Sequence, residues 1–90
     1  MNGIEMKRAR RQLGLMWGLG RGLSLAELAR ACRLSGERPS TVVRDYERGK
    51  TKISGPLSAL IDCYLRGVLP SDPLDEIITP NDEYEDDPDD

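Results

Sequence analysis

The side chains of this sequence best suited to binding chemistry are Ser40, Thr41, Arg44 and Arg48. Positions 40, 44 and 48 are four residues apart, so a helix would place them on one face, with Thr41 beside them. Hydroxyl groups approach base edges or phosphates closely, and an arginine one turn further along can form two hydrogen bonds to guanine. The pattern therefore predicts a helix face that reads the major groove of DNA; the alternative is a solvated, arginine-rich face.

Two further cations follow this segment. Lys50 and Lys52 come directly after Gly49, a residue that commonly ends helices, and are expected in a loop. Flexible cations in a loop can contact the sugar-phosphate backbone without reading sequence. The two lysines are therefore predicted to contribute affinity rather than specificity.

The charges of the sequence are segregated along the chain. Residues 1–70 contain all 13 Lys and Arg residues and 6 acidic ones, which gives a charge of +7, whereas residues 71–90 contain 10 acidic residues and no basic one. The formal net charge of -3 therefore combines a basic body with an acidic end. A basic body of this size is typical of proteins that bind a polyanion.

Other chemistries have little support in the sequence. There is no His, and Cys32 and Cys63 lie far apart without a CxxC pair, which argues against a zinc site and a redox motif. Both thiols are expected to be free and buried. Gly18, Gly20 and Gly22 lack the preceding strand and the following Lys-Ser/Thr of a phosphate-binding loop. We therefore expect no enzymatic activity and no cofactor, metal or small-molecule ligand.

Helix signals indicate how the chain positions these side chains. Asn2 with Glu5, and Ser24 with Glu27, have the spacing of capping boxes, and Pro39 suits the first position of a helix. The apolar positions expected in the core are Met6, Ala9, Leu13, Met16 and Trp17 in the first helix, Leu25, Leu28, Ala29 and Cys32 in the second, Val42, Val43 and Tyr46 in the third, and Leu57, Leu60, Ile61, Tyr64, Leu65 and Val68 in a fourth that begins at Gly55-Pro56 and ends near Gly67.

The remaining faces of the first two helices are charged. Those expected to point outward are Lys7, Arg8, Arg10 and Arg11 in the first helix, either solvated or on phosphates, and Glu27, Arg30 and Arg33 in the second. Residues 34–38 form a break between the second and third helices, and Gly36 is expected to supply its turn.

These signals predict an all-α fold, a compact four- to five-helix bundle containing a helix-turn-helix. Residues 1–70 would form the DNA-binding domain and residues 71–80 a short helix or linker. Asp72 is expected to cap this helix, and the helix either docks on the bundle or contacts a second subunit. Residues 81–90 are predicted to form a disordered acidic tail, which either serves solubility or folds over the basic face and competes with non-specific DNA. Without an apolar run that could span a bilayer or act as a signal peptide, the protein is expected to be cytoplasmic.

The sequence also resembles a known family in two places. Leu25-Ala26-Glu27-Leu28-Ala29, followed by Tyr46-Glu47-Arg48-Gly49, is similar to the lambda repressor/Cro-type helix-turn-helix regulators, the XRE family, with a likeness over about residues 4–69. The resemblance implies that the third helix lies in the major groove and the second crosses the backbone. It implies base-reading roles for Ser40, Thr41 and Arg44, and DNA-backbone contacts by Arg21, Ser24, Arg38, Arg48, Lys50 and Lys52.

Within this family the sequence looks like the compact bacterial or prophage members. They imply a sequence-specific regulator of transcription, a repressor or autorepressor that binds an inverted-repeat operator as a homodimer. The alternative is a protein-interaction or nucleic-acid-mimicking module that uses the same scaffold and acts through its acidic C-terminal tail.

This chain departs from the family pattern at three points. A glycine-rich stretch over residues 16–22 lengthens the first connection, and the break before the third helix is longer than the usual turn of about three to four residues. Leu25 stands where the family often has a Gln that holds a phosphate, so that contact would have to come from elsewhere.

Overall fold

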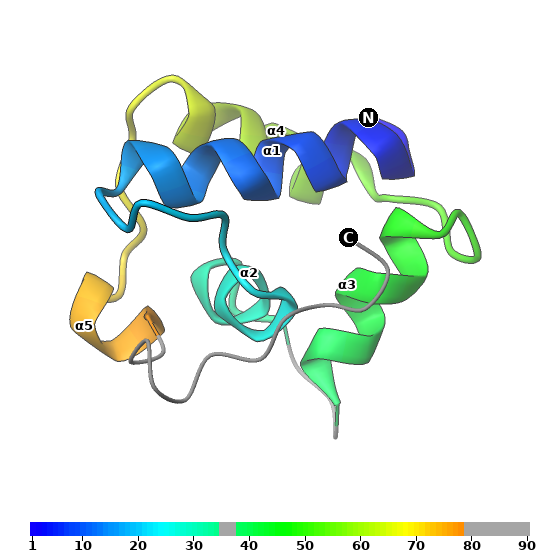
Figure 1. Ribbon diagram of the computed structural model, residues 1–90. Coiled ribbons are helices and arrows are strands. Elements are labelled where there is room, and N and C mark those ends of the chain that lie inside the picture. The colour runs from blue at the N-terminus through cyan, green and yellow to red at the C-terminus, as the bar shows by residue number, and fades with distance from the viewer. Residues whose placement is uncertain (35–37, 79–90) are drawn as a thin grey trace.

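The computed structural model describes residues 1–34 and 38–78, and within these ranges the protein is all-α, with five helices and no strand. The helices are α1 (Gly3–Met16), α2 (Leu25–Ala31), α3 (Pro39–Glu47), α4 (Gly55–Leu65) and α5 (Leu74–Ile77). α1 contacts both α3 and α4, while α2 contacts α3 and α5. Figure 1 shows α1 and α4 together on one side of the molecule, with α2, α3 and α5 on the other.

The predicted helix starts are confirmed by their hydrogen bonds. The Asn2 side chain accepts from the Glu5 amide at 2.8 Å, and Glu5 accepts from the Asn2 amide at 3.0 Å, which completes the first capping box. Ser24 and Glu27 form the second in the same way. Each box satisfies backbone donors that the first turn of a helix leaves without an intrahelical acceptor. These local signals explain why α1 and α2 begin where they do.

The core is aliphatic and draws on every helix. Its buried members are Met6, Ala9, Leu13, Leu23, Leu25, Leu28, Ala29, Ala31, Val43, Ile53, Leu57, Ile61, Tyr64 and Ile77. Two residues that were predicted for the core are exposed instead: Met16 is 40% exposed and Val68 is 54% exposed. Both come at or beyond the C-terminal end of a helix, where the chain turns away and the helical period no longer decides which side faces inward.

The short helix predicted after Pro70 is present and docks on the bundle. Ile77 is 1% exposed, and its carbonyl oxygen accepts a hydrogen bond from Arg30 Nε at 2.8 Å. The predicted cap by Asp72 is wrong, because Pro73 occupies the cap position and no side chain caps the helix. Asp72 instead accepts two hydrogen bonds from Arg33, at 2.7 and 3.0 Å. This bidentate contact lowers the pKa of the Asp72 carboxyl and further ties α5 to α2.

The break between α2 and α3 begins with Arg33, whose φ of 53° places it in the left-handed region. The predicted turn at Gly36 lies outside the described residues. α2 ends at Ala31 and α3 starts at Pro39, so the connection is longer than the tight turn of a standard helix-turn-helix. Among the described helices, none is long and apolar enough to cross a membrane.

Candidate nucleic-acid interface

α3 packs on the bundle by one side and leaves its polar side accessible. Val43 is fully buried and Tyr46 packs partly against the core, whereas Thr41 is exposed and Ser40 and Arg44 are partly exposed. Val42, predicted to pack on α2, is only partly buried and is not a member of the core cluster. The helix therefore presents hydroxyl groups near its N-terminal end and, one turn later, the partly exposed side chain of Arg44, whose Nε atom is buried.

Exposed cations lie at both ends of this helix. Arg38 is the residue before Pro39, and Arg48 caps the C-terminal end. Gly49 follows with a φ of 79°, and Lys50 and Lys52 come next in an exposed loop. We call the seven residues Arg38, Ser40, Thr41, Arg44, Arg48, Lys50 and Lys52 the α3 face. Cations at each end of the helix and short polar groups between them suit a groove of nucleic acid, in which base edges lie between two rows of phosphates.

Asp45 belongs on the same side of α3 and was missed in the sequence analysis. It lies one helical turn after Thr41, at the spacing that brings two side chains together, and it is partly exposed. A carboxylate here can accept a hydrogen bond from the amino group of cytosine. The same i, i+4 rule that groups Ser40 with Arg44 pairs Thr41 with Asp45, so the signal was present in the sequence.

A buried ion pair holds the C-terminal end of α3 against α1. Arg10 Nε donates to Glu47 Oε2 at 2.7 Å and Nη2 donates to Oε1 at 3.0 Å, while Nη1 donates to the Leu23 carbonyl at 2.6 Å. The Arg10 side chain is 1% exposed and that of Glu47 is 5% exposed. The prediction that Arg10 lies on the outer face of its helix is therefore wrong. Its position, four residues after Met6 and three before Leu13, already places it on the buried face.

The same side of α1 approaches α3 closely at its first residue. A Cβ on Gly3 would overlap the backbone carbonyl of Glu47 and lie 2.7 Å from that of Tyr46. Only a glycine lets the two backbones approach in this way. Contacts at Gly3 and Arg10 thus fix the C-terminal half of α3 from two points along α1.

A second ion pair closes the start of α2 and determines where Arg21 and Ser24 lie. Arg21 donates to both carboxylate oxygens of Glu27, at 2.8 and 3.0 Å, and also to the Gly22 carbonyl. Glu27 is fully buried, so its predicted outward orientation is wrong; the capping box draws its side chain back toward Ser24 and Arg21. The Ser24 hydroxyl accepts from the Glu27 amide. Arg21 and Ser24, two of the six residues predicted to contact the DNA backbone, therefore have structural roles at the start of α2.

The two cysteines differ in environment. Cys63 is exposed, so its predicted burial is wrong, while Cys32 is only partly exposed. Burial raises the pKa of the Cys32 thiol to about 11. The two thiols are not bonded to each other, and among residues 1–34 and 38–78 no three His, Cys, Asp or Glu side chains are placed to hold a metal ion.

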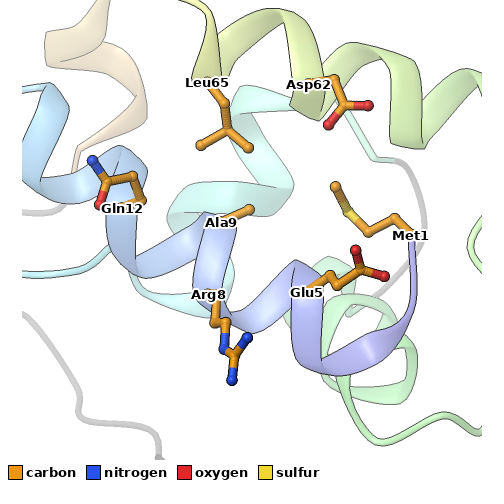
Figure 2. A pocket seen from close by; sticks show the side chains of 7 residues that line it. All are labelled: Met1, Glu5, Arg8, Ala9, Gln12, Asp62 and Leu65. Carbon is orange, nitrogen blue, oxygen red and sulfur yellow. The ribbon is translucent and has the colours of Figure 1, made fainter.

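A shallow hollow of about 420 Å³ lies between α1 and α4, away from the α3 face. Its lining consists of Met1, Glu5, Arg8, Ala9, Gln12, Asp62 and Leu65. Figure 2 shows Leu65 pointing from α4 toward α1, with the Arg8 guanidinium directed away from α4. Glu5 is the capping residue of α1. The lining contains no Ser, Thr, Cys or His, so it supplies no hydroxyl or thiol nucleophile and no imidazole base; its carboxylates are Glu5 and Asp62.

Among the predicted site residues, Ser40, Thr41 and Arg44 lie on one side of α3, with four exposed cations at its two ends. Arg21 and Ser24 lie apart from them, at the start of α2. Comparisons with family models, with curated proteins and with solved structures found no match to this chain.

Proposed function

We propose that this chain is a sequence-specific double-stranded DNA-binding regulator of transcription, a repressor or autorepressor of the lambda repressor/Cro type. The observation that carries the proposal is the α3 face: a helix anchored by a buried ion pair presents short polar groups outward between two sets of exposed cations. A rigidly held helix is what direct readout requires, because hydrogen bonds to base edges depend on position.

In this proposal α3 lies in the major groove with its N-terminal end closest to the bases. Ser40 and Thr41 contact base edges or phosphates, and Arg44 donates to the O6 and N7 atoms of a guanine. Asp45 adds an acceptor for a cytosine amino group. Base contacts of this kind supply the discrimination between sequences.

The cations of the α3 face supply the affinity that does not depend on sequence. Arg38, Arg48, Lys50 and Lys52 contact phosphates on the two sides of the groove, and each contact releases condensed counterions. Arg21 and Ser24 make no phosphate contact in this proposal, because their polar groups already serve the start of α2. Binding should therefore weaken steeply with salt.

The proposed active form is a homodimer in the bacterial cytoplasm. Two copies related by a two-fold axis would present their α3 helices about 34 Å apart, one turn of DNA, and would bind an inverted repeat. The half-site spacing is then a geometric consequence of the dimer.

The roles within the α3 face are tested by comparing Arg44→Ala with Lys50→Ala. Arg44→Ala is expected to weaken binding to the specific site by about 1–3 kcal/mol and to affect random DNA much less. Lys50→Ala should weaken both alike and make the salt dependence shallower by about one phosphate contact. Fluorescence anisotropy with labelled duplexes at several salt concentrations measures both effects.

Unfolding temperatures provide the control, since Arg44 is partly buried. A lowered affinity counts only for a variant that remains folded at the temperature of the titration. Equal losses of specific and random binding in folded Arg44→Ala would remove this residue from the base-reading set.

A further inference from the structure

Residues 79–90 form the most acidic segment of the chain. They include seven acidic residues and no basic one, and they follow Ile78 directly. The seven acids are Asp82, Glu83, Glu85, Asp86, Asp87, Asp89 and Asp90. A run of carboxylates along an extended chain presents charge of the same sign as a phosphate backbone.

The start of this segment is held at a defined place on the bundle. Ile77 is buried and its carbonyl accepts from Arg30 of α2, while Asp72 receives two hydrogen bonds from Arg33 just beyond α2. α2 in turn packs against α3. Ile77, two residues before the acidic segment, is therefore fixed relative to the helix that carries the α3 face.

The segment is long enough to reach that face. Twelve residues span at most about 40 Å when fully extended, whereas the longest dimension of the protein is 30 Å. An attached segment also meets the face at an effective concentration in the millimolar range, which compensates for weak individual contacts. Reach and tethering thus permit an intramolecular contact.

The α3 face carries a charge complementary to that of the segment. Exposed Arg38, Arg48, Lys50 and Lys52 lie at its two ends, whereas the exposed acids Asp75 and Glu76 lie beside the start of the segment and repel it. We propose that residues 79–90 occupy the α3 face in the absence of DNA and act as an intramolecular competitor of DNA. The competition with DNA rests on the function proposed above, but the contact itself does not.

Two consequences follow for DNA binding. Any duplex must first displace the segment. The apparent affinity for DNA therefore falls in proportion to the fraction of molecules whose α3 face is unoccupied. Salt weakens the contact of the segment with the face as it weakens DNA binding, so the competition is strongest at low salt. The segment therefore makes DNA binding by the full chain less dependent on salt than the α3 face alone would make it.

The contact is tested without DNA by comparing the full chain with a variant of the same length in which the seven acids become Asn or Gln. Amide shifts in nitrogen-15 NMR spectra at about 50 mM salt, where screening is modest, are expected to differ at Thr41, Arg44, Lys50 and Lys52. The differences should shrink at about 500 mM salt. Differences confined to residues 70–90 would overturn the proposal.

Competition with DNA is tested on a random duplex. The variant with the neutralised segment is expected to bind about tenfold more tightly than the full chain at about 50 mM salt, and within about twofold at 300 mM. Two matched pairs separate contact from overall charge: Asp86→Asn with Asp87→Asn in the segment, and Asp75→Asn with Glu76→Gln on α5, each removing two negative charges. Only the first pair should tighten binding appreciably; equal effects would overturn the competition.

The two proposals fail in different ways. If neither the full chain nor the neutralised variant binds DNA, while the amide shifts still mark the α3 face, the proposed DNA-binding function is wrong and the contact stands. If both bind DNA and the shifts avoid the α3 face, the contact is wrong and the DNA-binding function stands.

Discussion

The contact between Arg10 and Glu47 shows how one pair of residues fixes the geometry of the candidate interface. Both side chains are almost completely removed from water, which costs free energy that only close pairing and additional hydrogen bonds offset. Arg10 meets this requirement with two bonds to Glu47 and a third to the Leu23 carbonyl. The pair joins α1, α3 and the segment before α2 at one point.

Removing one partner of this pair is expected to be costly, because the other charge stays buried. Glu47→Gln should lower the free energy of unfolding by about 3–5 kcal/mol, as found when a buried pair is broken. The double variant Arg10→Met, Glu47→Leu should lose clearly less than the sum of the two single changes. Urea denaturation followed by circular dichroism measures the unmodified chain, Glu47→Gln, the single changes Arg10→Met and Glu47→Leu, and the double variant. Additive losses would show that the two side chains do not interact energetically.

The two thiols are expected to differ in reactivity, because alkylation requires the thiolate. Cys63 is exposed and should react with iodoacetamide in the native protein at about pH 8. Cys32, whose pKa is about 11, should react only when the protein unfolds. Mass spectrometry of the labelled protein checks this order; rapid labelling of Cys32 in the native protein would contradict it.

The same thiol makes stability depend on alkaline pH. In the unfolded chain Cys32 loses its proton near its ordinary pKa of 9.0, whereas the folded protein retains it up to about 11. The unfolded state then binds fewer protons, so the contribution of Cys32 to stability is complete below pH 9 and is lost as pH rises toward 11. Cys32→Ala should remove this part of the pH dependence in urea titrations, and Cys63→Ala should not.

At the scale of helices, local signals were sufficient to predict where α1, α2, α3 and α4 begin. The capping boxes at Asn2 and Ser24 and the proline at position 39 operate within one helical turn, so a single sequence reveals them. The pairs Arg10–Glu47 and Arg33–Asp72 were missed because their partners lie 37 and 39 residues apart. Many charged residues could have served as partners, and only the packed fold selects among them.

The connection between α1 and α2 illustrates a close approach that periodicity could not predict. A Cβ on Gly14 would overlap the Arg21 carbonyl and lie 2.6 Å from Gly22 Cα, so the chain folds back directly over the end of α1. From the sequence, the glycine-rich stretch over residues 16–22 was expected only to lengthen this connection. The structure adds that Gly14, inside the helix, is needed for space.

Gly14→Ala is therefore expected to destabilise the protein, although alanine normally favours a helix by about 1 kcal/mol over glycine. We expect a loss of at least about 2 kcal/mol in the free energy of unfolding, because backbone must move to relieve the overlap. Gly55→Ala is the matched control, since a Cβ there meets nothing within 4 Å. Thermal unfolding of both variants decides the matter, and a neutral Gly14→Ala would contradict the close approach.

At the scale of the whole molecule, the all-α fold and its docked fifth helix are confirmed, while the roles assigned to the α3 face remain predictions. Helical period and caps were enough for the architecture. They did not predict which charged residues stabilise the fold and which are accessible. Arg10 and Arg21 stabilise the fold, whereas Arg38, Arg48, Lys50 and Lys52 are exposed. These four exposed cations lie at the two ends of α3, whereas Arg8 and Arg66, also exposed, lie on α1 and just after α4.

The central claim is that the α3 face binds DNA in a sequence-specific way. The most direct measurement is the retardation of the duplex upstream of the gene that encodes this chain, at low salt, with random competitor DNA added in increasing excess. The account predicts a retarded complex that persists in excess competitor. With the Arg44→Ala variant, this complex should disappear at a lower excess of competitor than with the unmodified chain. Failure to retard that duplex, or a complex that random DNA removes in proportion to its amount, would contradict sequence-specific binding there.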